Sequence, residues 1–197
     1  MRAIGLMSGT SLDGIDASIL ETDGKNIFSA GPNINIPYDN ELRMGLKSLL
    51  GKKGDANGNF TRSLTLKHAE AVFSLLSAAD LKAKDIDVVG FHGQTIFHDP
   101  TKGITCQIGN GKLLADIIDI IVINDFRSND VAEGGQGAPL APVYHAALTQ
   151  TLELPIAILN LGGVANVTWI GVDGSFSAFA TGPGNALIDD WNTVNGL

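Results

Sequence analysis

The chain has 197 residues, of which 44% are hydrophobic and 17% are charged. This length and composition suit one globular domain, or slightly more than one, with an ample apolar core. The net charge is −8 at pH 7, and lysine and arginine do not cluster. This acidic balance argues against nucleic acid or an anionic membrane surface as the main partner.

Cysteine content and the first residues bear on the compartment. Cys106 is the single cysteine, so an internal disulfide is excluded and a reducing compartment is expected. The chain starts with strand-like alternation and soon reaches Asp13 and Asp16, unlike a signal peptide. The longest apolar stretch, residues 117–123, is interrupted by Asp119 and is too short to cross a bilayer. We therefore expect a cytoplasmic protein without a membrane span.

The first part of the chain predicts a β-hairpin, a third strand and two helices. Apolar residues on both sides of a Gly/Ser/Thr/Asp turn predict the hairpin, and alternating polarity predicts the third strand. Helical spacing of leucine, alanine and valine predicts the two helices. In chain order these elements span residues 3–7, 15–21, 27–37, 40–50 and 61–79.

The remaining chain predicts an alternation of strands and helices. Strands are expected at 88–91, 105–108 and 120–124, a second hairpin at 156–161 and 166–170, and helices at 111–118, 139–150 and 183–191. Three meandering strands followed by this alternation indicate an α/β domain with a mixed sheet. We interpret residues 1–130 as one lobe, and residues 131–197 as the start of a second, truncated lobe.

The turn of the first hairpin is a candidate phosphate site. It offers consecutive backbone N–H groups, several hydroxyls and two glycines that let the backbone approach an anion. Its carboxylates would repel a bare phosphate, which suggests a metal ion or a sugar hydroxyl nearby. A plain polar hairpin tip is the alternative, and no Walker loop is present. The candidate residues are Gly9, Thr10, Ser11, Leu12, Asp13, Gly14, Ile15 and Asp16.

Polar residues also follow two of the predicted strands. His92 and Gln94 are expected to hydrogen-bond a polar ligand, because open α/β sheets place ligands at the carboxyl ends of strands. A metal bound by His92 and His98, or a histidine satisfied within its own loop, are the alternatives. Asp125 and Arg127 open the second polar segment, where an ion pair of Arg127 is the structural alternative. The candidate substrate-binding residues are His92, Gln94, Thr95, Asp125, Arg127 and Asp130.

A second glycine turn lies in the last part of the chain. Gly162 and Gly163 interrupt the second hairpin and suit phosphate as the first turn does. Thr181 precedes the predicted last helix, whose N-terminal N–H groups suit an anion. The alternative is that Thr181 only caps that helix.

Taken together, these segments resemble the anhydro-N-acetylmuramic acid kinases, a branch of the sugar kinase/actin/heat-shock-ATPase superfamily. The resemblance covers the whole chain in the family's order and near its spacing, and six motifs in order are far more specific than one glycine loop. It implies a ribonuclease-H-like, actin-like ATPase lobe with a mixed sheet. The matching stretches are 7–17, 90–98, 107–110, 125–139, 160–168 and 181–189.

The resemblance also implies an activity. Such enzymes use ATP and Mg²⁺ to convert 1,6-anhydro-N-acetylmuramic acid to N-acetylmuramic acid 6-phosphate in cell-wall recycling. A general base activates water to attack the anomeric carbon, and the departing O6 takes the γ-phosphoryl group. The two glycine turns would hold the triphosphate, with Asp13 as a candidate Mg²⁺ contact. A cytoplasmic enzyme, with a homodimer as one allowed assembly, follows from the family.

Two departures from the family pattern limit this expectation. Family members run to nearly twice this length. The family's general base is an Asp directly before the Thr/Cys-Gly-Pro motif, and Ala180 stands at that position here. Alanine cannot accept a proton, so this chain is expected to be inactive or impaired. A non-catalytic sugar- or phosphate-binding protein of the same fold, or another small-substrate phosphotransferase of the superfamily, are the alternatives.

Overall fold

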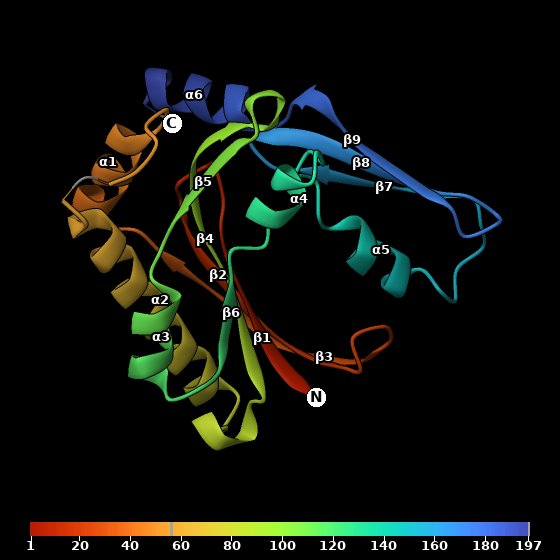
Figure 1. Ribbon diagram of the computed structural model, residues 1–197, viewed down its shortest axis with the longest axis horizontal. Helices are drawn as coiled ribbons and strands as arrows, with labels where there is room; N and C mark the ends of the chain where they lie inside the picture. Colours follow the sequence, from red (N-terminus) through yellow and green to blue (C-terminus); the bar gives the residue numbers. More distant parts are fainter. Residues whose placement is uncertain (56, 197) are drawn as a thin grey trace. The chain divides into compact units, whose positions relative to one another are not determined.

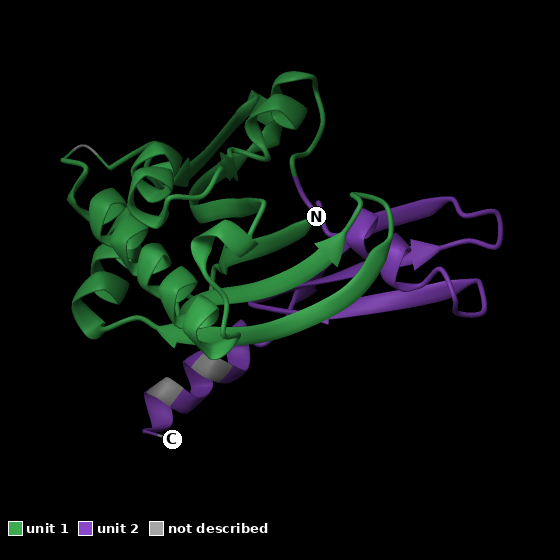
Figure 2. Cartoon of the chain, turned by 90° about the horizontal axis from the view of Figure 1, so that it is seen from below, with its two compact units in different colours: residues 1–137 green, residues 138–197 purple. Residues whose placement is uncertain are grey.

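The computed structural model describes residues 1–55 and 57–196, with the backbone alone at positions 189 and 193. The chain forms two compact units, residues 1–137 and residues 138–197 (Figure 2).

The first unit contains six strands and four α-helices within the described residues (Figure 1). The predicted hairpin, third strand and first two helices are all present, and the predicted helix at 111–118 has the expected limits. In chain order the elements are β1 (Arg2–Ser8), β2 (Gly14–Thr22), β3 (Ile27–Pro37), α1 (Asn40–Leu49), α2 (Asn59–Ala78), β4 (Val88–Asp99), β5 (Ile104–Ile108), α3 (Gly111–Ile118), β6 (Val122–Asn124) and α4 (Ser128–Ala132), with 3₁₀ turns at Ala83–Asp85 and Pro100–Lys102.

The six strands form one mixed sheet. Its order is β3-β2-β1-β4-β5, and β6 also pairs with β4. β1, β4 and β6 are parallel, whereas β2, β3 and β5 join through antiparallel pairs. This sheet confirms the predicted α/β class and is consistent with an actin-like ATPase lobe.

Helices α1, α2 and α3 lie on one side of the sheet in Figure 1 and bury its core. Their start points follow from capping: Asp39 accepts from Leu42 N at 2.8 Å, and Asn110 accepts from Leu113 N at 2.9 Å. The core is mainly aliphatic, with the aromatic residues Phe91 and Tyr38, and one fully buried histidine lies beside it. His68 lies on α2, contacts the Phe91 ring edge-on and pairs through Nδ1 with Leu64 O at 2.8 Å.

The buried His68 should make the first unit sensitive to acid. Burial lowers the pKa of His68 from 6.5 to about 4, so the folded state keeps the ring neutral while the unfolded chain takes up a proton first. Above pH 6.5 the ring is neutral in both states, so its contribution to the free energy of unfolding is fully present. As the pH falls from 6.5 through 4, the free energy of unfolding decreases by about 3 kcal/mol. We expect urea unfolding at several pH values to show this loss, and His68→Leu to flatten it. An unchanged acid slope in His68→Leu would contradict the assignment.

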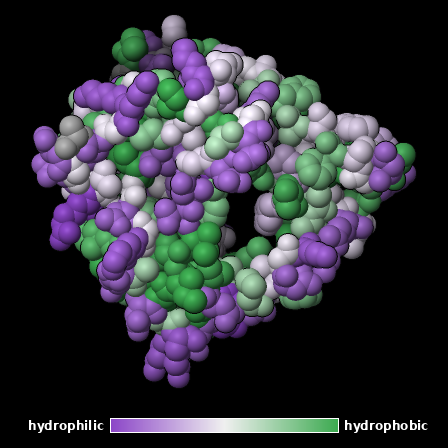
Figure 3. All heavy atoms as spheres, in the orientation of Figure 1, coloured by the Kyte–Doolittle hydropathy of each residue, from purple (hydrophilic) through white to green (hydrophobic). Residues whose placement is uncertain are grey.

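Two strands differ from their predicted form. β4 runs on to Asp99, well past the predicted 88–91, because its second half pairs with β5. β6 is shorter than predicted and is not a buried strand, since Ile123 is exposed, as is Ile121 just before it. Apolar surface gathers over β6 in Figure 3. The apolar run of residues 120–124 predicted a buried strand, but β6 pairs only with β4 among the described strands, so its other edge is not covered by a strand.

The described residues of the second unit form a three-stranded antiparallel sheet and two helices. Its elements are α5 (Pro142–Leu148), β7 (Ile156–Leu161), β8 (Val164–Ile170), β9 (Phe176–Pro183) and α6 (Ala186–Asn195). The predicted hairpin is present, but β9 was missed. Thr181 lies inside β9 and does not cap a helix, because α6 begins only at Ala186. No helix among the described residues of either unit is long and apolar enough to span a membrane.

Candidate functional site

Three parallel strands bring the first polar segments to one edge of the sheet. In the sheet register Leu6 of β1 pairs with Phe91 of β4, and Phe91 pairs with Asn124 of β6. The segments that follow these three residues therefore start side by side. They are the turn after β1, residues 92–95 of β4 and the loop that begins at Asp125. The sequence predicted polar segments at this edge because each of them follows a predicted strand.

The turn between β1 and β2 is ordered by local contacts. Asp13 Oδ1 accepts from Ser11 Oγ at 2.7 Å and from Gly14 N at 3.0 Å. Leu12 has a φ of 55°, which is uncommon for a leucine, and its buried side chain anchors the turn in the core. Strained backbone of this kind is a feature of ligand-binding turns. A side chain at Gly9 would meet only Ser11 Oγ, at an ordinary 3.4 Å, so the backbone there is open.

The eight candidate residues of this turn fall into two groups. Thr10, Asp13 and Asp16 are exposed, and Gly9 and Ser11 are partly exposed. Leu12, Gly14 and Ile15 are buried, so only their backbone could face a ligand. Gly14 is required by packing, because a Cβ there would lie 2.5 Å from Ile36 O. Asp16 Oδ1 accepts from Asn35 Nδ2 at 2.9 Å.

A buried hydrogen-bond chain lies at the base of this turn. Ser8 Oγ lies 2.6 Å from Tyr38 Oη and also contacts Gln94 Oε1. The amide oxygen can only accept, so Ser8 donates to Gln94 and Tyr38 donates to Ser8. Gln94 Nε2 donates to Thr95 O at 3.1 Å. Burial, together with the charges of Asp13 and Asp16, raises the pKa of Tyr38 to about 12 and keeps its proton in place.

The buried hydrogen-bond chain gives Gln94 a structural role. Its side chain is fully buried and both ends are hydrogen-bonded, so in this structure it joins the turn to β4. Its direct contact with a ligand stays a prediction. Tyr38 was not singled out from the sequence, and its residue type gave no signal, since its partner Ser8 lies 30 positions away. Ser8 was expected as one of the hydroxyls that the turn offers to a ligand, but its side chain is buried and hydrogen-bonded within the protein.

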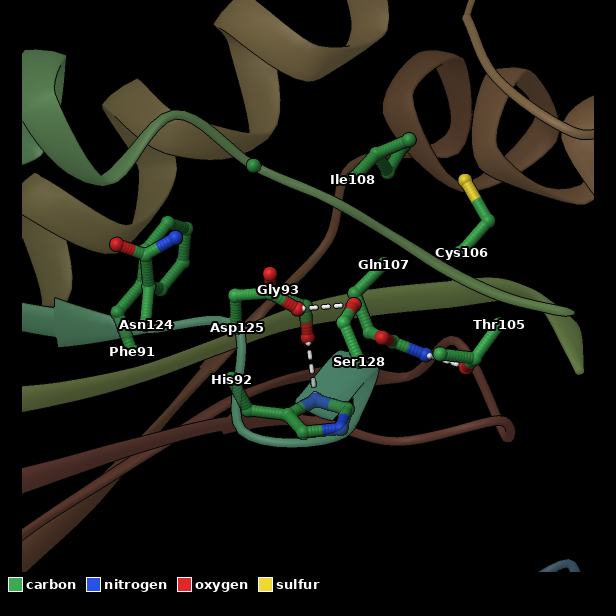
Figure 4. A pocket seen from close by; sticks show the side chains of 11 residues that line it. Phe91, His92, Gly93, Thr105, Cys106, Gln107, Ile108, Asn124, Asp125 and Ser128 are labelled. Atoms are coloured by element: carbon green, nitrogen blue, oxygen red, sulfur yellow. Dashed lines mark hydrogen bonds between the residues drawn. The ribbon is translucent and has the colours of Figure 1, made fainter. Parts of the chain in front are cut away.

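A polar pocket of about 260 Å³ lies between β4, β5 and the segment that follows β6. Figure 4 shows its lining side chains, with His92, Asp125 and Ser128 on one side and Cys106 and Ile108 at the other. It is lined by Phe91, His92, Gly93, Thr105, Cys106, Gln107, Ile108, Gly109, Asn124, Asp125 and Ser128. The predicted candidates His92 and Asp125 therefore meet in one cavity.

His92 is held in one neutral form. Arg127 Nε donates to His92 Nε2 at 2.9 Å, and because a guanidinium only donates, the ring proton is on Nδ1, which donates to Gly93 O at 2.7 Å. Burial and the Arg127 charge lower the pKa of His92, which favours the same neutral form. Both ring nitrogens are thus engaged, leaving His92 unavailable to a metal shared with His98. The described residues hold no group of three or more His, Cys, Asp or Glu placed for a metal.

Arg127 does not form the ion pair that was the structural alternative. Within the described part of the chain, its partners are His92 and Gly137 O, the latter at 2.5 Å, and neither Asp125 nor Asp130 bridges to it. Asp125 Oδ1 accepts from Ser128 Oγ at 2.5 Å, also drawn in Figure 4. Asp130 Oδ2 accepts from Gly137 N at 2.6 Å.

Gln107 is a pocket residue that the sequence reasoning did not select. Its Nε2 donates to Thr95 Oγ1 at 3.1 Å and to Thr105 Oγ1 at 2.8 Å. Its buried Oε1 has no hydrogen-bond partner among the described residues. A fixed amide with a buried acceptor in a pocket wall suits a ligand hydroxyl or N–H. The signal was present, since residues 107–110 form one of the six matching stretches.

The second unit brings its two glycine motifs together. Asn185 N donates to Gly162 O at 2.9 Å, and Gly184 N donates to Gly163 O at 3.0 Å. A Cβ at position 184 would lie 2.1 Å from Gly162 O, so this approach requires glycine. Ala180 is exposed on β9 and pairs with Asn166 of β8.

The mixed sheet, its parallel strand ends and the turn after β1 are consistent with a lobe of the actin-like ATPase class. The model of the family "Anhydro-N-acetylmuramic acid kinase" matches residues 1–195. The chain belongs to this family.

Curated relatives agree with the family match. A protein of this name from Paramagnetospirillum magneticum is 58% identical over 97% of the chain, and those from Acidiphilium cryptum and Rhodospirillum rubrum are 50% identical over 97% and 96%. These matches cover 54%, 53% and 51% of the relatives, so the chain spans about half their length. Among solved structures, a reductive activator for a corrinoid, iron-sulfur protein aligns with 93% of the chain and 31% of its own, at 12% identity and a TM-score of 0.46, too low to support an argument.

Proposed function

We propose that the whole protein is an ATP-dependent kinase that converts 1,6-anhydro-N-acetylmuramic acid to N-acetylmuramic acid 6-phosphate, with hydrolytic opening of the anhydro bridge, in peptidoglycan recycling. The observation that carries the proposal is the family match over residues 1–195. The relatives named Anhydro-N-acetylmuramic acid kinase support it over almost the whole chain. A cytoplasmic enzyme is part of the proposal, since ATP and a free Cys106 fit a reducing compartment. A homodimer is the assembly we would test first.

The turn between β1 and β2 fits the phosphates of ATP. Its open backbone at Gly9 and the exposed hydroxyl of Thr10 can approach phosphate oxygens, and Ser11 is fixed by Asp13. The exposed Asp13 carboxylate is the candidate contact for Mg²⁺. When bound, Mg²⁺ would offset the charge of the phosphates and of the transferred group.

The pocket beside β4 fits a polar sugar. Its volume of about 260 Å³ and its hydrogen-bonding groups suit a single ring with several hydroxyls. Asp125 can accept from a hydroxyl, as can the buried oxygen of Gln107. His92 is held in place by Arg127, and Gln107 is held by the hydroxyl of Thr95, which keeps this wall preorganised.

Residues 131–197 are proposed as the start of a second lobe, after a first lobe of residues 1–130. In that lobe Gly162 and Gly163 would form the second phosphate turn. Ala180 stands at the proposed base position, so the base is missing there. This observation favours one second candidate function, which is binding of the sugar or of phosphate without turnover.

Product analysis on the whole protein tests the proposal. The protein is incubated with ATP, Mg²⁺ and either 1,6-anhydro-N-acetylmuramic acid or N-acetylmuramic acid, and the sugar phosphate is measured by mass spectrometry. We expect slow formation of N-acetylmuramic acid 6-phosphate from the anhydro sugar alone. Use of N-acetylmuramic acid instead would indicate another phosphotransferase. If neither the natural form nor Ala180→Asp makes any product, the proposed activity is wrong.

A further inference from the structure

The backbone N–H and C=O of Gly137 are held by two residues at the start of α4, Asp130 and Arg127. Arg127 Nη1 donates to Gly137 O at 2.5 Å, and Gly137 N donates to Asp130 Oδ2 at 2.6 Å. Gly137 is buried, its φ is +64°, and a Cβ there would lie 2.6 Å from Val131 Cγ2. Both polar groups of this residue are therefore fixed in a conformation that favours glycine.

Asp130 organises the loop that leads to Gly137. Gly135 N donates to Asp130 O at 2.7 Å. A Cβ at position 135 would lie 2.3 Å from Asp130 Oδ2, so the loop passes directly against the carboxylate. The glycines at 135 and 137 thus let the chain wrap around one side chain, which accounts for this glycine-rich segment by packing.

Arg127 connects the same peptide to the pocket. Its Nε donates to His92 Nε2, while its Nη1 holds Gly137 O. His92 lines the pocket of about 260 Å³. One planar, rigid guanidinium therefore links the pocket wall to Gly137, and a lysine could not make both contacts in this geometry.

Gly137 is also the last residue of the first compact unit, and the chain enters the second unit at Ala138 (Figure 2). We propose that Arg127 and Asp130 are positioning residues: they clamp the Gly137 peptide, fix the direction in which the chain leaves the first unit, and tie it to the pocket wall at His92. The effect on turnover rests on the proposed function, whereas the clamp itself does not.

Hydrogen exchange on the whole protein, without ligand, tests the clamp. Mass spectrometry would follow the peptide that contains residues 133–138 in the natural protein, Asp130→Ala, Asp130→Asn and Asn129→Ala. We expect exchange at Gly137 to rise about 10- to 100-fold in Asp130→Ala, because a hydrogen bond to a charged acceptor is lost. Asp130→Asn keeps an acceptor oxygen and should restore most of the protection. Asn129→Ala, on the exposed side of α4, is the matched control and should exchange normally.

Kinetics separate positioning from direct contact with the sugar. We expect Asp130→Ala to lower kcat about 10-fold with little change in the KM of the sugar, and Asp130→Asn to recover it. Arg127→Lys should raise exchange at Gly137 as well, since one amine cannot replace both guanidinium contacts. Unchanged exchange in Asp130→Ala, or an Asp130→Asn variant as impaired as Asp130→Ala, would overturn the clamp. Altered exchange in a protein without kinase activity would instead leave the clamp standing and reject the proposed function.

Discussion

Replacing Ala180 by aspartate is expected to raise the rate of sugar phosphorylation by about 10²–10⁴-fold, the usual contribution of a general base. Ala180 is exposed on β9, so the carboxylate can be added without burying a charge. The aspartate would take the proton of the attacking water, which alanine cannot do. Release of ADP in the presence of 1,6-anhydro-N-acetylmuramic acid measures the effect on the whole protein.

A matched control places the same charge elsewhere on β9. Ala178 lies two residues earlier on the same face of the strand and pairs with Thr168. Ala178→Asp should leave the rate close to that of the natural protein or below it. Equal rates for Ala180→Asp and the natural protein would remove the assignment of position 180 as the base.

Gly93→Ala is expected to lower the free energy of unfolding of the first unit by about 2–5 kcal/mol. Gly93 has a φ of +68°, which costs a residue with a side chain about 1–2 kcal/mol. The added Cβ would also lie 2.3 Å from Ile108 O, and this strand backbone is held by the Gln94–Ile108 pair. Overpacking of that kind costs a further 1–3 kcal/mol or so. Because Gly93 lines the pocket, sugar affinity should fall as well.

Gly103→Ala separates the cost of a positive φ from the cost of the close contact made by the added Cβ. Gly103 has nearly the same φ, +67°, but a Cβ there meets nothing within 4 Å. Urea unfolding should show a loss of only about 1–2 kcal/mol for this variant. The same loss in both variants would mean that the strand at Ile108 moves aside and that the close approach does not matter.

Local patterns predicted the elements that local contacts form. The hairpin of β1 and β2 follows from apolar runs around a polar turn, and α3 has its predicted limits, with Asn110 capping its start in the structure. The missed β9 and the late start of α6 have a common cause. Phe176–Pro183 lacks a strong alternating pattern, and it is a strand because it pairs with β8.

The partners of the site residues could not be predicted in the same way. The structural alternative paired Arg127, a candidate substrate-binding residue, with a carboxylate, but its donors reach His92 and Gly137. Gln94 was expected to hydrogen-bond a ligand, which stays a prediction, and the structure adds that it accepts from Ser8, 86 positions away in the chain. Such contacts depend on how strands pair across the sheet, which residue type and spacing do not encode.

The turn after β1 has some features that the sequence determines and others that only the tertiary structure determines. The sequence by itself determined that a glycine and hydroxyl turn joins two strands, because turn chemistry and alternation act within a few residues. It also determined the family, whose motifs run through the whole chain. Only the tertiary structure decided that Leu12 and Ile15 are buried, that Ser8 and Tyr38 support the turn from below, and that a polar pocket lies along the same sheet edge. These features depend on the parallel register of β1, β4 and β6, which is set by packing of the whole first unit.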